Sequence, residues 1–88
     1  MSRYTVEISR RAIKSIAALP RKEEQRVRAA IELLADEPRP PSCLPLTGEQ
    51  SVYRVRVGDY RILYKVIVTR LVILVIRVGH RRDVYRPR

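Results

Sequence analysis

Apolar positions recur every three or four residues in the first half of the chain and mostly every second residue in the other half. The helical spacing predicts a short helix from Arg10 and a longer one over 21–36, separated by Pro20. Ser9 is the expected N-cap of the short helix. Pro38 should end the long helix, because the residue before a proline is driven out of helical geometry. The expected buried stripes are Ala12, Ile13, Ile16 and Ala17 on the short helix, and Val27, Ala30, Ile31 and Leu34 on the long one.

Alternating and continuous apolar runs predict four strands. A short alternating strand over 4–8 precedes the helices. Residues 51–66 predict a β-hairpin whose two-residue turn is Gly58–Asp59. The run 71–76 is apolar on both faces, which is typical of a strand in the middle of a sheet. A short final strand around 84–85 is left open.

The order of these elements predicts the fold class. The Pro-rich segment 37–50 is expected to be a loop with Leu44 and Leu46 turned inward. The turn between Val66 and Leu71 lacks glycine, asparagine and proline, so the register of the last strand and the face that carries Arg77 stay open. The order β-α-α-β-β-β predicts an α+β fold, in which a two-helix hairpin packs on one face of a small, mostly antiparallel four-stranded sheet.

The two-residue turn fixes the register of the hairpin and concentrates positive charge on one face. Arg56 should lie directly opposite Arg61, and such a like-charged pair costs roughly 0.2–1 kcal/mol. A rigid sheet that holds cations side by side indicates an anion site, for which phosphate is the obvious ligand. The helices should cover the face of Tyr53, Val55, Ile62 and Tyr64, and the face of Arg54, Arg56, Arg61, Leu63 and Lys65 should stay open to solvent.

Composition and charge narrow the function classes. The chain has 88 residues and a net charge of +10, which fits one small domain over 1–88 that binds nucleic acid or an acidic protein. The charge is uneven: residues 1–50 hold nine Lys/Arg against seven Asp/Glu, and residues 51–88 hold ten against two. Cys43 and His80 are the single cysteine and histidine, which excludes an internal disulfide framework and a zinc cluster, and we expect no metal or cofactor.

The chain carries no targeting or membrane signal that we recognise. Its amino terminus lacks the apolar run of a signal peptide, and the run 71–76 is too short to span a bilayer. We therefore expect a cytoplasmic protein without a membrane partner.

Three strings of this sequence are similar to the RelE branch of the RelE/ParE toxin superfamily. They are LTG at 46–48, YRVRVGDYRILY at 53–64 and VIRVGHRRDVY at 75–85, and the likeness covers nearly the whole chain. It implies a type II toxin that cleaves mRNA in the decoding site of the ribosome, by attack of the RNA 2′-hydroxyl on the adjacent phosphate. It also implies an acidic, RelB-like antitoxin that blocks the toxin. The complex of the two proteins would bind operator DNA through the antitoxin.

The resemblance also implies which residues form the active site. It assigns the phosphate contacts to Arg54 and Arg56 and the catalytic positions to Arg61, Arg81 and Tyr85. Lys65 shares the predicted face of the hairpin arginines and is a further candidate phosphate contact. Arg82 is another candidate, for which the alternative is a surface or ribosome contact.

This chain departs from the best-studied RelE type, which has lysines where it has Arg54 and Arg56. Arginine effectively cannot lose its proton, so these two residues are poor general bases. His80 is the candidate acceptor, because a histidine ordinarily titrates near neutrality. Tyr85 should orient the reacting group or stack on a base.

Two other functions remain open on sequence grounds. A ParE-like gyrase poison would share the fold without the concentrated Arg/His/Tyr set. An inactive homologue would bind nucleic acid without cleaving it. For the hairpin arginines, the alternative is a solvated strand face that guards a sheet edge.

Overall fold

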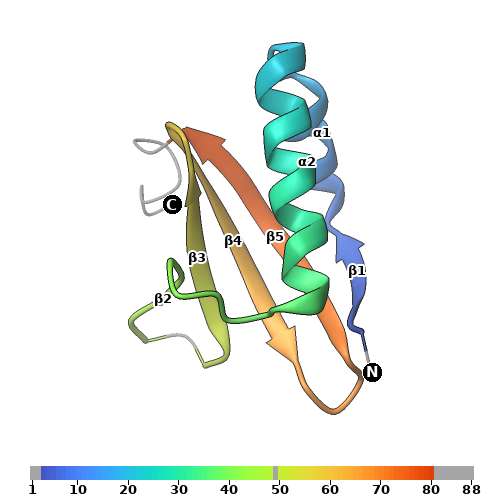
Figure 1. The fold of residues 1–88 in the computed structure, drawn as a ribbon, viewed down its shortest axis with the longest axis vertical. Helices are drawn as coiled ribbons and strands as arrows, with labels where there is room; N and C mark the ends of the chain where they lie inside the picture. Colours follow the sequence, from blue (N-terminus) through green and yellow to red (C-terminus); the bar gives the residue numbers. More distant parts are fainter. Residues whose placement is uncertain (1–2, 49, 81–88) are drawn as a thin grey trace.

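A computed structural model describes residues 3–48 and 50–80. Within these residues, two antiparallel helices pack on one face of a five-stranded sheet (Figure 1). The strand order is β1-β5-β4-β3-β2, so β4 is the middle strand. The elements are β1 Thr5–Ile8, α1 Arg10–Ala17, α2 Arg21–Asp36, β2 Leu44–Pro45, β3 Val52–Val57, β4 Tyr60–Ile67 and β5 Val72–His80. The predicted α+β class is confirmed, with one strand more than the sequence suggested.

The start of α1 is fixed by the side chain of Ser9. Its Oγ accepts a hydrogen bond from the backbone N–H of Ala12 at 3.1 Å, which confirms the predicted N-cap. The same hydroxyl donates to the carbonyl of Ile76 at 2.7 Å. Because Ile76 lies in β5, this one side chain joins the helix to the sheet. The backbone N–H of Ser9 also donates to the carbonyl of Val75 at 2.9 Å.

The helices cover the predicted face of the hairpin. The core joins both helices to the strands, and it includes Ala12, Ile16, Val27, Ile31, Leu34, Val55, Ile62 and Tyr64. The prediction that Ile13 and Ala17 share the buried stripe of α1 was wrong, since both are exposed. This helix is two turns long and packs through the single row formed by Ala12 and Ile16, so the next row faces outward.

The extra strand β2 lies in the segment predicted to be a loop. Leu44 pairs with Arg54 and Pro45 with Tyr53 in an antiparallel ladder. Proline cannot donate a ladder hydrogen bond, but it is tolerated on an edge strand. The prediction that Leu44 turns inward was wrong: the residue is 50% exposed, because β2 is the edge of the sheet and Leu44 shares the face of Arg54. Leu46 is half-buried.

Two tyrosines of the hairpin hold the segment that connects α2 to β2. The Tyr64 hydroxyl donates to the carbonyl of Pro38 at 2.7 Å, and burial raises the pKa of Tyr64 well above its ordinary value, so the hydroxyl remains a donor. Arg39 Nε donates to the Tyr53 hydroxyl at 3.0 Å. The Arg39 guanidinium carbon also lies 5.5 Å from the centre of the Tyr53 ring. The segment is therefore fixed to the sheet at two points.

The last strand occupies the predicted interior position. It pairs antiparallel with β4 and parallel with β1, where Thr5 pairs with Val72, so the sheet is mixed. The turn before it ends at Leu71, which has a φ of 54°. The β4–β5 register shifts between Leu63 and Tyr64, and Arg77 lies opposite Leu63. In the described part of the chain, neither helix has the length and apolar composition needed to cross a bilayer.

Replacing Ser9 by alanine should lower the free energy of unfolding by about 1–2 kcal/mol, because the helix loses its cap and the link to Ile76 is broken. Urea unfolding followed by circular dichroism measures the change. Ser15→Ala, inside the same helix, is the matched control and should change stability by less than about 0.5 kcal/mol. Equal losses in the two variants would contradict the capping role.

Candidate functional site

The β3–β4 hairpin has the register that the sequence predicts. Val57 pairs with Tyr60, and Arg56 pairs with Arg61. Gly58 has a φ of 60° and Asp59 does not have a positive φ, which is the pattern of a type II′ turn. A Cβ at position 58 would lie 3.3 Å from a guanidinium nitrogen of Arg26 in α2. Glycine therefore serves both the turn conformation and the close approach of α2.

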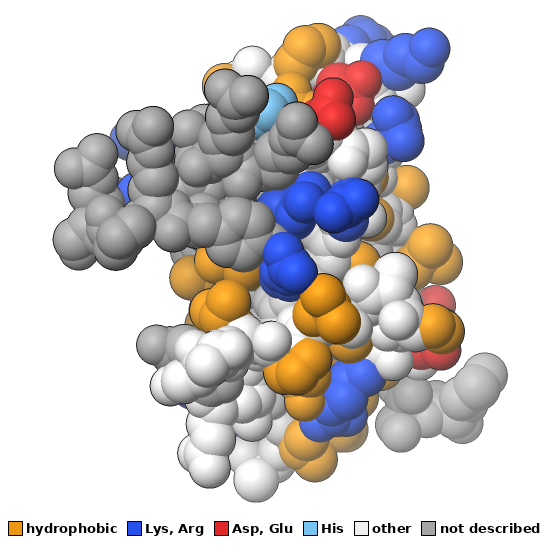
Figure 2. Space-filling view, turned by 90° about the vertical axis from the view of Figure 1, so that its left-hand side faces the viewer, with side chains coloured by type: hydrophobic (Ala, Val, Ile, Leu, Met, Phe, Trp, Pro, Cys, Tyr) orange, Lys and Arg blue, Asp and Glu red, His pale blue; other side chains and the backbone are white. Residues whose placement is uncertain are grey.

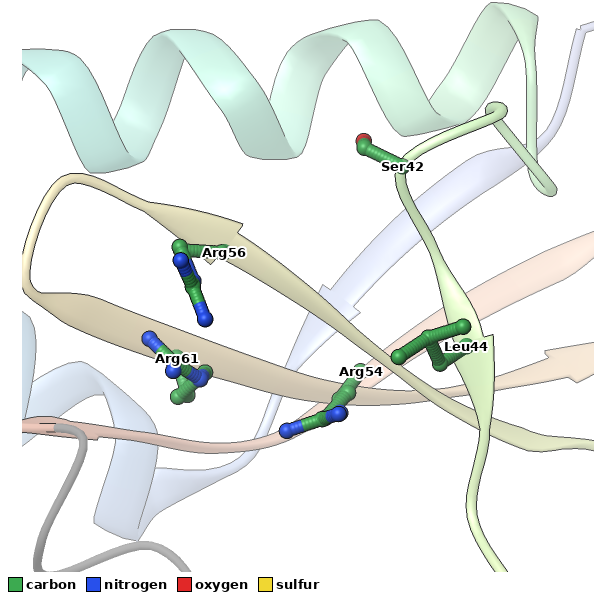
Figure 3. A pocket seen from close by; sticks show the side chains of 5 residues that line it. All are labelled: Ser42, Leu44, Arg54, Arg56 and Arg61. Atoms are coloured by element: carbon green, nitrogen blue, oxygen red, sulfur yellow. The ribbon is translucent and has the colours of Figure 1, made fainter.

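Three arginines of this hairpin line one pocket. Arg54 and Arg56 come from β3 and Arg61 from β4, and the pocket of about 330 Å³ is completed by Ser42 and Leu44. The guanidinium groups of Arg56 and Arg61 point toward each other across the hairpin, and Arg54 extends toward them from the side (Figure 3). Seen from the left of Figure 1, Lys and Arg side chains gather near the middle of the molecular face, beside hydrophobic side chains (Figure 2). Strand pairing sets the spacing of the three cations.

The arginine face is less open than the sequence suggested. Arg61 is only 6% exposed and Leu63 is buried, whereas Arg54 is half-buried and Arg56 is exposed. The expectation of a fully solvated face is therefore wrong at the middle strand, where β3 and β5 flank β4 on both sides. Arg54 and Arg61 also make interactions within the protein. A cation held away from bulk water attracts an anionic ligand more strongly than a solvated one does.

His80 lies in a different pocket from the arginines. It pairs with Tyr60, and the two rings meet edge to face with their centres 5.9 Å apart. Because side chains alternate along a strand, Tyr60 and its neighbour Arg61 belong to opposite faces. His80 lines a cavity together with Arg11 of α1 and with Arg77. The structure does not bring His80 into the arginine pocket.

Lys65 is not gathered with the three arginines either. It lines a separate cavity with Ser51 and Thr69. It is four residues from Arg61 along β4, which corresponds to about 13 Å in an extended strand. The other three predicted site residues, Arg81, Arg82 and Tyr85, lie outside the described residues.

Sequence reasoning missed two pocket residues, Ser42 and Leu44. The available signal was the alternation of Leu44 and Leu46 around a proline, which has the period of a strand. The density of prolines in this segment favoured a loop, and so the wall of the pocket was not predicted.

The pocket provides fixed, permanently charged donors. A guanidinium group presents planar hydrogen-bond donors that match phosphate oxygens, and it cannot act as a base. The arrangement can therefore bind a phosphate and stabilise charge that develops on it. Across residues 3–48 and 50–80, no group of three or more His, Cys, Asp or Glu side chains is arranged to hold a metal ion.

Comparisons with known proteins give a consistent family. The model for the ParE toxin of the type II toxin–antitoxin system parDE matches residues 6–85. A Methanocaldococcus jannaschii protein named as a candidate toxin, RelE1, is 30% identical over 87 residues, which cover 96% of this chain and 97% of that protein.

Solved structures agree with this family. A chain of the archaeal RelE–RelB complex from Pyrococcus horikoshii is 30% identical with a TM-score of 0.77, covering 91% of this chain and 97% of that one. The isolated RelE toxin of E. coli is 27% identical with a TM-score of 0.79, covering 93% and 90%. The sequence relationship, the shared fold and the family match together show that this chain belongs to the RelE/ParE family of type II toxin–antitoxin toxins, as a RelE-like toxin.

Proposed function

We propose that this RelE-like toxin cleaves mRNA on the ribosome and so inhibits translation. The observation that carries this proposal is the convergence of Arg54, Arg56 and Arg61 on one pocket of a paired sheet. Keeping like charges adjacent is unfavourable for folding alone. It is favourable for a site that must hold a phosphodiester, because the ligand's negative charge offsets the repulsion.

The proposed reaction uses the RNA itself as the nucleophile. The 2′-oxygen forms a bond to the adjacent phosphorus, and the bond from phosphorus to the 5′-oxygen breaks. The 2′-hydroxyl proton passes to an acceptor, and the leaving 5′-oxygen takes up a proton. Negative charge builds on the non-bridging oxygens, and arginines fixed on strands stabilise this charge without reorganising.

The proton transfers need groups other than the hairpin arginines, because a guanidinium stays protonated. We propose that Arg81 adds a further fixed cation and that Tyr85 orients the reacting group or stacks on a base, as the RelE resemblance implies, with Arg82 contacting the RNA. We assign no proton transfer to His80, which lies beside Tyr60 and α1. Lys65 lines a different cavity from Arg61, and we propose that it contacts a neighbouring part of the RNA.

An acidic, RelB-like antitoxin is the partner that we propose for this toxin. The net charge of +10 favours an acidic chain, and the related Pyrococcus horikoshii toxin was solved as a RelE–RelB complex. The toxin would contact operator DNA only as part of this complex. Co-expression with a small acidic reading frame beside the toxin gene should yield a stable complex on gel filtration, whereas separate elution would contradict the pairing.

A gyrase-poisoning function is the second candidate, because the matching family model is that of a ParE toxin. The arginine pocket favours the nuclease over it, since a gyrase poison does not need a phosphate site on its hairpin. The purified toxin should leave DNA supercoiling by gyrase unchanged while it blocks translation in a reconstituted system. Inhibition of supercoiling together with uncut mRNA would reverse this assignment.

Removing the buried cation should disable cleavage. We expect Arg61→Ala to slow translation-dependent mRNA cleavage by about 10²–10³-fold, the usual effect of losing one donor that stabilises a developing oxyanion. Arg61→Lys should recover only part of the rate, because lysine keeps the charge and loses the planar fork. Primer extension on a reporter mRNA measures the cuts.

The matched control for this series is Arg70→Ala. Arg70 is exposed in the β4–β5 turn and lies outside the arginine pocket, so its loss removes the same net charge elsewhere. It should retain nearly full cleavage. If Arg70→Ala and Arg61→Ala reduce cleavage equally, the pocket has no special role and only net charge matters.

A further inference from the structure

We propose that the arginine pocket is a nucleotide site in which Leu44 and Ser42 form a wall for the nucleobase, beside the phosphate held by the arginines. This inference rests on the proposed function and adds the part of the substrate that the cations do not contact. It assigns a role to two residues that the hairpin motif does not include.

The position of Leu44 is the first argument. It is the register partner of Arg54, so the two side chains are direct neighbours on the same face of the sheet. Figure 3 shows Leu44 on the opposite side of the pocket from Arg56 and Arg61. The residue is 50% exposed, although it lines the same pocket as three cations. An exposed apolar surface next to a phosphate site suits the flat, apolar face of a base.

The second argument is that this wall is held in place before any ligand binds. Tyr64 donates to the carbonyl of Pro38, and the N–H of Cys43 donates to the carbonyl of Pro40 at 2.9 Å. On the other side, the N–H of Leu46 donates to the carbonyl of Val52 at 2.8 Å. Ser42 and Leu44 lie between these anchors. A wall that is already ordered loses little conformational entropy when a ligand packs against it.

The third argument is the match between the pocket and a single nucleotide. A nucleotide combines an anionic group with an apolar ring, and this pocket has Arg56 and Arg61 at one end and Leu44, next to Arg54, at the other. Its volume of about 330 Å³ lies at the lower end of the range for small-molecule sites. The Ser42 hydroxyl can donate or accept a hydrogen bond, so it can meet the edge of any base. We therefore expect binding of the base with weak preference for its identity.

The test separates the base from the phosphate. The full chain, labelled with ¹⁵N, is titrated with adenosine 5′-monophosphate and with ribose 5-phosphate, and amide shifts give each Kd. The two ligands share the sugar and the phosphate and differ only in the base. We expect the nucleotide to bind about ten-fold more tightly, because its base covers the apolar surface of Leu44. In Leu44→Ala this ratio should fall to about two-fold, with ribose 5-phosphate binding unchanged.

The control is Leu33→Ala, which removes a leucine that is 67% exposed on α2 and does not line the pocket. It should keep the ten-fold ratio. Equal binding of the two ligands, or a ratio unaffected by Leu44→Ala, would overturn the nucleobase wall and leave the phosphate site intact. No binding of either ligand would overturn both the wall and the phosphate site on which the proposed function rests.

Discussion

The pairing register of the β3–β4 hairpin is the constraint on which the fold and the site both depend. A slip of one residue would place Val55 of β3 on the face opposite to Ile62 and Tyr64 of β4, so the helices could no longer bury the apolar residues of both strands. Burying each such side chain contributes about 1.5–3 kcal/mol, against a repulsion of roughly 0.2–1 kcal/mol between Arg56 and Arg61 on the other face. The free energy gained by burying the apolar face therefore exceeds the repulsion between the two arginines by a wide margin. Packing of the apolar face under the helices therefore keeps the arginines adjacent on the other face, despite their mutual repulsion.

One face of the hairpin stabilises the fold and the other carries the charge, which explains why the two faces are so different. The face under α1 and α2 is packed with aliphatic side chains, and Tyr64 adds a hydrogen bond to Pro38 that ties down the segment leading to β2. The opposite face carries the charge and the pocket. Because the same residues that stabilise the fold also fix the pocket wall, stability and the geometry of the site are coupled through the hairpin.

The sequence predicts the parts of this structure that depend on local signals. The bounds of α2, the Ser9 cap and the hairpin register follow from prolines, a capping side chain and a two-residue turn. The strand β2 could not be predicted in the same way, since it is two residues long and one of them is a proline.

Only part of the candidate site could be predicted, because local sequence signals determine only some of its geometry. Arg54, Arg56 and Arg61 lie on one hairpin, so their grouping follows from local pairing. The burial of Arg61 depends on β4 being the middle strand, and the separation of His80 depends on the β4–β5 register. That register follows a turn without a recognisable signal and includes a shift between Leu63 and Tyr64. Neither property is encoded within a short window of sequence.

The parallel pairing of β1 with β5 also governs the order in which the chain can assemble. Thr5 has its partner in Val72, and the contact between Ser9 and Ile76 likewise joins residues 67 positions apart. During synthesis, β1 leaves the exit tunnel long before its neighbour exists, and contacts of such separation form late because closing a long loop costs entropy. The helices and the hairpin can form from local contacts, but the edge of the sheet closes only after Val72 to Val75 have emerged. Co-translational folding of this toxin therefore finishes with the two distant ends of the domain coming together.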